Sequence, residues 1–401
     1  MNNMKKNTIV DLAIFGAQPA FQDDLHVGRP NCGNREHLFE RINDILDRKW
    51  FSNNGRYVQE FEKKIAQQSG TKHCIAVCNG TVGLEIAVRA LGLTGEVIMP
   101  SFTFAATAHA VQWIGITPVF CDINPDTYNI DAAKIEKLIT PKTTGIVGVH
   151  LFGRPCDIEA LSAIAQRHNL KLLFDAAHAV SVSCKGKMIG GFGDAEVFSF
   201  HATKFLNAFE GGAIVTNNDE LATKMRSMKN FGYSGNDNIS VLGINGKMSE
   251  VCAAMGLTNL ESIEKFVAIN LRNYKLYERE LVGLYGVKLM QFDQAQKNNY
   301  QYLVIEIDDE TTQISRDQLV KILHTENVLA KRYYYPGCHR VEPYCSQEIY
   351  KNIQLPETER IAQRTMSLPT GTAVGEKEIS AICQIIRFSI ENVEQIQEKI
   401  S

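Results

Sequence analysis

A lysine and an aspartate follow two short apolar segments in the middle of the chain, and this pair could do chemistry together. Lys204 comes after the run 195–200, and Asp175 comes after the run 172–174; both runs are typical of buried strands. Ligand sites of open α/β sheets lie beyond the carboxyl ends of the strands, so both side chains can face one small molecule. A lysine that forms a Schiff base, with an aspartate that keeps a pyridine nitrogen protonated, is what pyridoxal phosphate requires of a protein.

The sequence around Lys204 favours a reactive amine. Apolar residues flank it on both sides: Phe198, Phe200, Phe205, Leu206 and Phe209. Apolar surroundings disfavour the ammonium ion, so we expect a lowered pKa for Lys204 and a more nucleophilic amine. The glycines of 210–212 allow a tight turn before the next predicted strand, 213–216. The alternative is ordinary: a lysine after a strand is usually a solvated loop residue, and an aspartate at a strand end is often a helix cap.

The run SFHATK (199–204), with EGGAIVT (210–216) after it and FDAAHA (174–179) before it, resembles the DegT/DnrJ/EryC1/StrS family of sugar aminotransferases. These are fold-type I pyridoxal phosphate enzymes that act on nucleotide-linked keto-sugars. In this family the motif lysine holds the cofactor, and Lys204 occupies its place. The dehydratase branch has a histidine there, so the resemblance implies amino transfer rather than deoxygenation.

The resemblance implies a phosphate site at the start of a helix. The predicted strand over 73–78 leads into Asn79, Gly80 and Thr81, where the glycine permits a tight turn and either neighbour can cap the helix that follows. A helix N-terminus attracts phosphate, and in the family the corresponding Gly-Thr pair binds the cofactor phosphate. We therefore assign Gly80, Thr81 and Ser199 to this phosphate, although Asn-Gly-Thr before a helix is most often only a cap.

Three further residues match family positions around the cofactor ring. Phe104, which follows the predicted strand over 96–99, stands where an aromatic ring stacks on the pyridine. Asp175 would pair with the ring nitrogen, and His178 would contact the ring hydroxyl. The alternatives are a core aromatic at Phe104 and a neutral core histidine at His178.

Two further segments match parts of the family that bind beyond the cofactor ring. Asn245, in the segment 243–250, matches an asparagine that reaches the phosphate bound by the other subunit, which implies a homodimer with shared active sites. A capped loop before a helix over 249–260 is the alternative. Residues around 331–339 lie where the family gathers groups around the nucleotide-sugar, and we assign four of them to the substrate: Lys331, Tyr333, Tyr335 and His339.

Within the family, several segments resemble the members that aminate C4 of dTDP-4-keto-6-deoxy-D-glucose, among them 15–21, 27–31, 95–110 and 335–344. This resemblance implies L-glutamate as amino donor and dTDP-4-amino-4,6-dideoxy-D-glucose as product, for O-antigen or other glycan biosynthesis. The nearest alternative is a C3 aminotransferase on a dTDP-linked 3-keto-6-deoxyhexose, because C3 and C4 differ only in how the sugar is turned toward Lys204. The alternative from another class is a catalytically idle protein of this fold that serves as a regulator or scaffold.

The bulk composition is that of an ordinary globular chain. The 401 residues are 44% hydrophobic and 22% charged, and a formal net charge of -3 gives no electrostatic footprint for nucleic acid. The 10 cysteines are scattered, which predicts free thiols and no metal site. The basic start is interrupted at Asp11, so we expect no signal peptide, no membrane span and a cytoplasmic protein.

From residue 73 the chain alternates predicted strands and helices, which is typical of a doubly wound sheet. We predict an α/β protein of fold type I: a large pyridoxal phosphate-binding domain over 36–260, with a mixed, mostly parallel sheet flanked by helices, and a small α+β domain over 261–401. Residues 1–35 form an arm that packs with the small domain. In that domain we expect strands over 302–307 and 328–334, and helices over 315–326 and 376–389.

Overall fold

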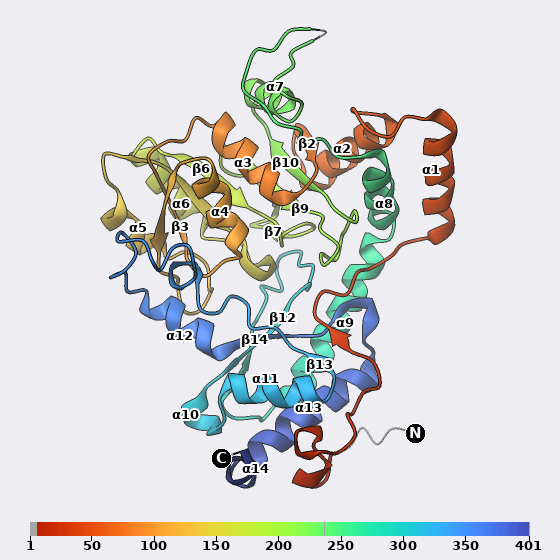
Figure 1. Ribbon diagram of the computed structural model, residues 1–401, viewed down its shortest axis with the longest axis vertical. Coiled ribbons are helices and arrows are strands. Elements are labelled where there is room, and N and C mark those ends of the chain that lie inside the picture. The colour runs from red at the N-terminus through yellow and green to blue at the C-terminus, as the bar shows by residue number, and fades with distance from the viewer. Residues whose placement is uncertain (1–5, 236, 401) are drawn as a thin grey trace.

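A seven-stranded sheet organises the first half of the chain in the computed structural model, which describes residues 6–235 and 237–400 (Figure 1). Its strand order is β2-β10-β9-β6-β5-β3-β4. β10 is antiparallel to both of its neighbours, and the other pairs are parallel, which confirms the predicted mixed, mostly parallel sheet. The strands are β2 (His73–Val77), β3 (Glu96–Pro100), β4 (Thr117–Cys121), β5 (Thr143–Val149), β6 (Lys171–Asp175), β9 (Ala195–Ser199) and β10 (Gly212–Thr216).

Helices cover both faces of this sheet. Successive side chains of a strand point to opposite faces, and here the side chains on both faces are apolar and buried. In β2, Cys74 and Ala76 belong to one apolar layer, whereas Ile75 and Val77 belong to the other. Because helices cover both faces, a ligand site is expected at the edge of the sheet where the parallel strands end. The first layer is covered by α2 (Arg56–Ser69), α6 (Ile158–Arg167) and α8 (Glu250–Leu260), and the second by α3 (Gly80–Ala90), α4 (Ala105–Trp113) and α7 (Asp219–Met228).

A smaller antiparallel sheet, of order β11-β12-β14, packs in a second apolar core, which also includes Phe102 and Phe152 from the first half of the chain. α9 (Ile263–Leu281) runs from the first half of the molecule to this second one (Figure 1). In the described part of the chain, no helix is long and apolar enough to cross a membrane. The remaining elements are β11 (Val287–Leu289), β12 (Leu303–Ile307), β14 (Thr365–Leu368), β7 (Ser183–Cys184), β8 (Lys187–Met188), α1 (Arg35–Arg48), α5 (Ala132–Ile135), α10 (Asp309–Thr312), α11 (Arg316–Thr325), α12 (Pro356–Arg364), α13 (Glu376–Glu391) and α14 (Val393–Ile400).

The described part of the N-terminal segment lies against the second core. β1 (Leu25–His26) pairs in parallel with β13 (Val328–Leu329), and the buried Glu326 carboxylate accepts hydrogen bonds from the Ala13 and Ala20 N–H groups at 2.8 and 2.7 Å. The division of the chain into 1–35, 36–260 and 261–401 stays a prediction. Its residues 1–5 and 401 lie outside the described residues.

The predicted strand over 328–334 is wrong beyond Leu329. After Lys331, which pairs once with Ser367, the chain enters turns that lead to Pro336. A proline lacks an N–H group and restricts the residue before it, so a regular strand does not continue through it. The turns bring Tyr333 and Tyr334 to the edge of the first sheet. The sequence reasoning also missed β11, β14, α10, α12 and α14 in the second half of the chain, and β1, β7, β8 and α5 in the first half.

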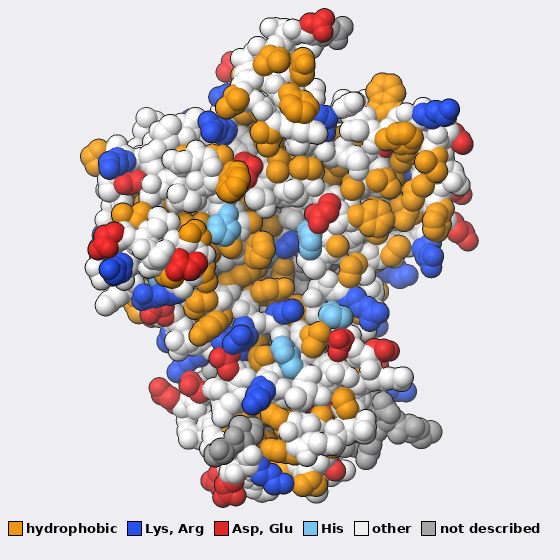
Figure 2. Space-filling model, viewed as in Figure 1, with side chains coloured by type: hydrophobic (Ala, Val, Ile, Leu, Met, Phe, Trp, Pro, Cys, Tyr) orange, Lys and Arg blue, Asp and Glu red, His pale blue; other side chains and the backbone are white. Residues whose placement is uncertain are grey.

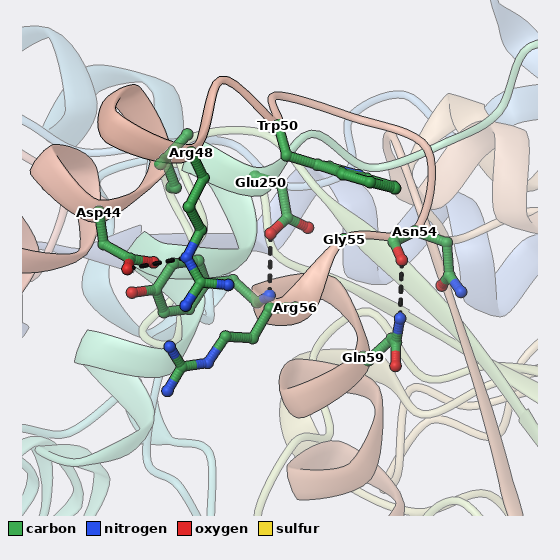
Figure 3. Close-up of a pocket in the computed structure, with 10 residues that line it drawn as sticks. Asp44, Arg48, Trp50, Asn54, Gly55, Arg56, Gln59 and Glu250 are labelled. Atoms are coloured by element: carbon green, nitrogen blue, oxygen red, sulfur yellow. Dashed lines mark hydrogen bonds and ion pairs between the residues drawn. The ribbon is translucent and has the colours of Figure 1, made fainter.

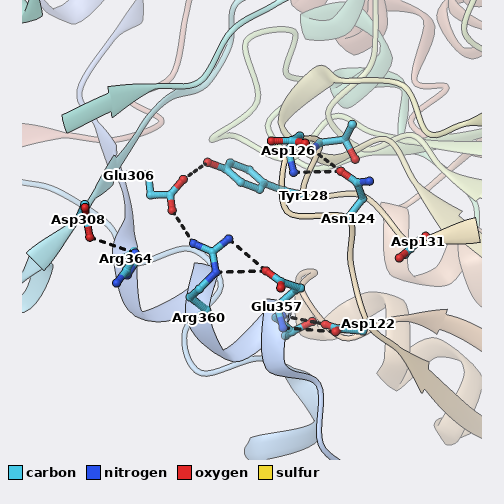
Figure 4. Close-up of polar contacts among 12 residues, drawn as sticks. Asp122, Asn124, Asp126, Tyr128, Asp131, Glu306, Asp308, Glu357, Arg360 and Arg364 are labelled. Carbon is cyan, nitrogen blue, oxygen red and sulfur yellow. Dashed lines mark hydrogen bonds and ion pairs between the residues drawn. The ribbon is translucent and has the colours of Figure 1, made fainter. Parts of the chain in front are cut away.

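A polar network joins the end of β4 to α12 (Figure 4). The Asp122 carboxylate accepts hydrogen bonds from the Thr358 N–H and hydroxyl at 2.8 and 2.9 Å and from Lys134 Nζ at 2.9 Å. Thr358 lies in the first turn of α12, where the helix dipole favours an anion. Burial raises the pKa of Asp122, but these hydrogen bonds outweigh it and the pKa is lowered. Arg360 extends the network to Glu306 of β12 at 3.0 Å.

We expect Asp122→Asn to lower the free energy of unfolding by about 1–3 kcal/mol at pH 7, because a charged acceptor at a helix N-terminus is lost. Since the folded-state pKa is depressed, this stabilisation is present above the unfolded pKa of about 3.9 and is lost as the pH falls through the lower folded value. Urea unfolding at pH 7 and pH 3 measures both effects. The exposed Asp126 supplies the control, since Asp126→Asn should change stability by less than about 0.5 kcal/mol. Equal effects of the two substitutions would contradict this account.

Candidate active site

A cavity of about 580 Å³ lies beyond the carboxyl ends of β5, β6 and β9. The loops after these strands line it together with the start of α3, the start of α4 and tyrosines from the second half of the chain. The cavity therefore stands where the topology of a parallel sheet places ligands. It brings together eight of the predicted site residues: Gly80, Thr81, Phe104, Asp175, His178, Ser199, Lys204 and Tyr333.

Lys204 lies in a loop that hydrogen bonds hold in place. The loop is closed at its ends, because the Phe200 N–H group donates to the Gly211 carbonyl at 2.8 Å. Asn31, from the N-terminal segment, donates to the Phe205 carbonyl at 2.9 Å and so ties the middle of the loop down. The backbone of Lys204 is thereby fixed, and its side chain is the part that can reach a ligand.

The Lys204 amine lies close to a phenol and a carboxylate. Nζ donates a hydrogen bond to Tyr302 Oη at 3.2 Å and lies 5.8 Å from the centroid of that ring. Burial lowers the pKa of Lys204 to about 8, and the negative charge of Asp175 offsets this shift only in part. The lowered pKa expected from the apolar neighbours is confirmed. At neutral pH the amine is therefore neutral far more often than a surface lysine, and the neutral form is the nucleophile.

We expect the rate at which the full-length chain takes up added pyridoxal phosphate to rise with pH around a midpoint near 8. Only an unprotonated amine can attack an aldehyde, so the rate falls as the ammonium ion forms. Stopped-flow absorbance of the cofactor, with protein prepared without it, measures the profile. Lys204→Arg is the control, because a guanidinium stays protonated and should show no covalent phase. A midpoint near the ordinary lysine value of 10.5 would overturn the expectation.

Asp175 ends β6, and its carboxylate is held from two sides. The Thr107 hydroxyl donates to Oδ2 at 2.8 Å, and the Ala177 N–H group donates to Oδ1 at 3.1 Å. Burial raises the pKa of Asp175, against the opposing effect of these two hydrogen bonds and of the charge on Lys204. A buried carboxylate with a fixed orientation is suited to pairing with a protonated ring nitrogen, since the cation would favour its charged form.

His178 lies beside Asp175 as a neutral ring. Its Nδ1 accepts a hydrogen bond from the Phe152 N–H group at 3.1 Å, and its Nε2 lies 3.3 Å from Tyr334 Oη. Burial, together with the charge on Lys204, lowers the pKa of His178 well below its ordinary value. Because Nδ1 accepts, the neutral ring carries its proton on Nε2 and donates it toward Tyr334. His178 is thus both a neutral buried histidine and a residue that lines the cavity; its contact with a cofactor hydroxyl stays a prediction.

The start of α3 forms an end of the cavity that suits an anion. Asn79 caps the helix through Oδ1, which accepts the Val82 N–H group at 2.8 Å. Gly80 and Thr81 are the first two residues of α3, where N–H groups have no partner within the helix. A Cβ atom at Gly80 would lie 3.1 Å from the Ser199 Cβ atom, so a glycine keeps this end open. The cap and the phosphate site are compatible because Asn79 accepts the Val82 N–H group, whereas the phosphate is assigned to Gly80 and Thr81.

Phe104 presents an aromatic face to the cavity. The residue precedes α4, its side chain is 60% exposed, and its ring centroid lies 6.3 Å from that of Tyr334. The alternative of a core aromatic at Phe104 is therefore wrong. An exposed ring beside a cavity is free to pack against a flat ligand, and stacking on a pyridine ring stays a prediction.

Three of the four residues assigned to the substrate lie away from the lining of this cavity. Lys331 and Tyr335 are exposed, and the guanidinium carbons of Arg316 and Arg332 each lie 5.3 Å from the centroid of the Tyr335 ring. His339 is buried, with Nδ1 bonded to the Ser101 hydroxyl at 2.7 Å and Nε2 to the Glu359 carboxylate at 3.0 Å. The structure brings only Tyr333 of this predicted set to the described cavity lining.

Asn245 also lies outside the lining of the cavity. It is exposed in the segment between α7 and α8, where it forms an isolated antiparallel bridge with Asn230. The predicted contact is with a phosphate in another subunit, so a single chain leaves it a prediction.

The sequence reasoning missed Tyr302, Tyr334 and Thr107. Tyr302 is 98 residues beyond Lys204 and lies just before β12, and the sequence pattern there predicts only an ordinary strand residue. Thr107 lies inside α4 with its hydroxyl directed at Asp175. Nothing in the local pattern marks these residues, because their partners are distant in the chain.

A second hollow, of about 530 Å³, lies between α1 and α2 (Figure 3). Three of its charged groups have partners: Arg48 pairs with Asp44 at 2.9 Å, and the Glu250 carboxylate accepts the Tyr57 and Val58 N–H groups at the start of α2. The Arg56 guanidinium carbon lies 5.7 Å from the centroid of the Tyr57 ring. Among the described residues that line it, none belongs to the predicted site. The chemistry of this chain is therefore assigned to the first cavity.

The donor set of the first cavity fits pyridoxal phosphate. A lysine of lowered pKa can hold the aldehyde carbon, an oriented carboxylate can pair with the ring nitrogen, and the start of α3 with Ser199 can bind the phosphate. These groups follow the carboxyl ends of β2, β6 and β9, which lie at one edge of the sheet.

The known proteins that resemble this chain include transaminases named for nucleotide-sugars. Residues 33–387 match the family described as the DegT/DnrJ/EryC1/StrS aminotransferase family. The chain is 38% identical over 363 residues to the dTDP-4-amino-4,6-dideoxy-D-glucose transaminase of Shigella dysenteriae, a match that covers 90% of this chain and 98% of the relative. It is 35% identical over 363 residues to the GDP-perosamine synthase of Caulobacter vibrioides, with 89% and 96% covered.

A solved structure shares the whole fold. DesI, crystallised in the presence of its TDP-sugar product, superposes with a TM-score of 0.94 at 47% sequence identity, covering 98% of this chain and 99% of that chain. The two chains therefore share both lobes of the fold and the segments that line the cavity.

Proposed function

The chain belongs to the DegT/DnrJ/EryC1/StrS aminotransferase family, and we propose that it transfers an amino group from L-glutamate to C4 of dTDP-4-keto-6-deoxy-D-glucose. At the coarser level it is a pyridoxal phosphate-dependent sugar aminotransferase that acts on nucleotide-linked keto-sugars. The product of the proposed reaction is dTDP-4-amino-4,6-dideoxy-D-glucose. The Shigella relative is named for a dTDP-sugar and DesI was crystallised in the presence of a TDP-sugar product, which supports a thymidine nucleotide, whereas the Caulobacter relative is named for a GDP-sugar.

One observation carries the proposal: a lysine amine of lowered pKa and an oriented carboxylate share one cavity with the start of a helix. Pyridoxal phosphate, when bound, supplies an electron sink that makes a proton on the neighbouring carbon removable. Asp175 keeps the ring nitrogen protonated, and the N–H groups of Gly80 and Thr81 bind the phosphate. Lys204 would first hold the cofactor; once free, its amine would take a proton from the carbon of the amino donor and pass it to the cofactor carbon that the lysine had held.

We further propose that the enzyme is a homodimer with shared active sites. Figure 2 shows hydrophobic side chains gathered over the α1 and α2 end of the molecule. Four large apolar residues there are each more than half exposed: Phe39, Leu46, Trp50 and Phe51. Such an exposed apolar surface is typical of a protein interface. In the dimer, Asn245 of one chain would contact the phosphate held by its partner.

Mixed dimers test the shared site. Lys204→Ala and Asn245→Ala each damage both sites of their own homodimer, but a dimer of one chain of each kind contains one intact site. We expect dimers isolated through two different affinity tags to regain up to about half of the wild-type activity. Activity no higher than that of the Asn245→Ala homodimer would rule out a contribution of Asn245 across the interface.

The assay for the reaction is incubation of the protein with pyridoxal phosphate, L-glutamate and dTDP-4-keto-6-deoxy-D-glucose. Release of 2-oxoglutarate and a 4-amino sugar in the NMR spectrum are the expected results. Efficient conversion of a dTDP-linked 3-keto sugar, with no reaction of the 4-keto sugar, would replace the proposal with the C3 reaction. Preference for the GDP-linked sugar would overturn the nucleotide assignment. If cells that carry the Lys204→Ala variant behave like cells that carry the wild-type protein, a regulator or scaffold would be favoured.

A further inference from the structure

The phenol of Tyr302 reaches the active-site lysine from the other half of the molecule. Tyr302 is 8% exposed, and its hydroxyl accepts a hydrogen bond from Lys204 Nζ at 3.2 Å. Its ring centroid lies 4.5 Å from that of His178 and 5.3 Å from that of Phe152. Tyr302 therefore touches groups that follow three different strands of the first sheet.

The segment that carries Tyr302 is fastened to the same loops. The Asn299 side-chain amide donates to the carbonyl of His178 at 2.8 Å and to that of Val180 at 2.9 Å. Asn270 of α9 in turn donates to the Asn299 carbonyl at 2.9 Å. Because Asn299 is buried and lies three residues before Tyr302, these bonds fix the phenol relative to the turn after Asp175.

Lys204 has one hydrogen-bonding partner for its amine among the described residues, and that partner is Tyr302. Burial of the amine disfavours its charged form. A hydroxyl oxygen that accepts from the ammonium ion acts in the opposite sense, since it stabilises the charged form. The phenol also limits where the amine can rest when the lysine is not attached to anything.

We propose that Tyr302 is a positioning residue for Lys204, which holds the free amine beside the turn after Asp175 and stabilises its proton between the two halves of the reaction. The proposal rests on the proposed transaminase function, in which the free Lys204 amine takes a proton from the carbon of the amino donor and, in the second half of the reaction, delivers a proton to the sugar carbon that gains the amino group. Tyr302 neither gains nor loses a proton in this scheme; its oxygen accepts the hydrogen bond while the ammonium ion exists.

The test is Tyr302→Phe, which removes one oxygen and keeps the ring. The pH profile of cofactor uptake by the full-length chain reports the protonation of Lys204, and its midpoint should fall by about one pH unit, the shift expected when a charged donor loses one hydrogen bond. We also expect kcat to fall about tenfold with little change in the KM for the sugar, because the amine remains chemically competent but is less often in place.

Tyr300→Phe is the matched control. Tyr300 is 7% exposed and lies two residues away, but its hydroxyl donates to the Gln294 side chain at 3.2 Å, outside the active-site cavity. This variant loses a buried tyrosine hydroxyl as well, so a merely structural effect should appear in both variants. We expect the pH midpoint of Tyr300→Phe to match that of the wild type.

Coincident pH profiles for Tyr302→Phe, Tyr300→Phe and the wild type would overturn the proposal about Tyr302. That result would leave the proposed function intact, provided that Lys204→Ala shows no covalent uptake. Covalent uptake by Lys204→Ala would instead overturn the role of Lys204 and the proposed function with it. Tyr302→Met, which removes the hydroxyl through a flexible side chain, should show the same lowered midpoint, so the outcome does not depend on the folding of one variant.

Discussion

Replacing Lys204 with alanine is expected to lower kcat for amino transfer by about 10⁴-fold or more. In the proposed function the same amine holds the cofactor and moves the proton, and a positioned acid/base alone contributes on the order of 10²–10⁴-fold. The structure places this amine in the active-site cavity, with its pKa lowered to about 8 and its loop held by Asn31. No other lysine lines the cavity among the described residues, so a neighbouring amine cannot substitute for it.

The measurement is 2-oxoglutarate release with saturating cofactor, accompanied by the absorbance of the protein-bound cofactor. Lys171→Ala removes an exposed lysine at the start of β6 and should leave kcat within about twofold of the wild type. Partial rescue of Lys204→Ala by a small primary amine in the buffer would support the proton-transfer role. Activity of Lys204→Ala above a tenth of the wild-type value would contradict both roles of the lysine.

Replacing Asp175 with asparagine is expected to lower kcat/KM by on the order of 10²–10³-fold, the range seen when one preorganised electrostatic group is removed from an active site. The amide has nearly the same shape but no charge, so it cannot keep a ring nitrogen protonated. It is also mismatched to its surroundings. Thr107 and the Ala177 N–H group both donate toward the side chain, and an amide offers one acceptor and one donor where the carboxylate offers two acceptors.

Thr107→Val separates the charge of Asp175 from its orientation. This variant removes one hydrogen bond to the carboxylate and leaves the charge, so a loss of about tenfold or less is expected. Both variants are compared by kcat/KM for glutamate and by the dissociation constant for pyridoxal phosphate. Equal losses in the two variants would mean that orientation, and not charge, accounts for the role of Asp175.

The local sequence pattern was sufficient to predict most strands of the seven-stranded sheet. Most strands between residues 73 and 216 are continuous apolar runs bounded by turn residues, so short-range preferences and burial agree there. The same pattern placed Asp175 and Lys204 at strand ends, and parallel strands bring such ends to one edge. The second half of the chain was harder: α12 and β14 went unrecognised, and the tyrosine-rich run 331–336 forms turns where its composition favours a strand.

The amino-acid sequence was enough to single out Lys204, Asp175 and the start of α3 as candidates, because each follows a recognisable apolar strand, and the structure brings all three to one cavity. The tertiary structure decided what surrounds them. Tyr302 is hydrogen bonded to Lys204 although 98 residues separate them in the chain. His339 was assigned to the substrate for its position in a basic and aromatic run, but both of its ring nitrogens are hydrogen bonded, one to Ser101 and one to Glu359. A side chain's partners are fixed by packing between distant segments, and no local spacing encodes that packing.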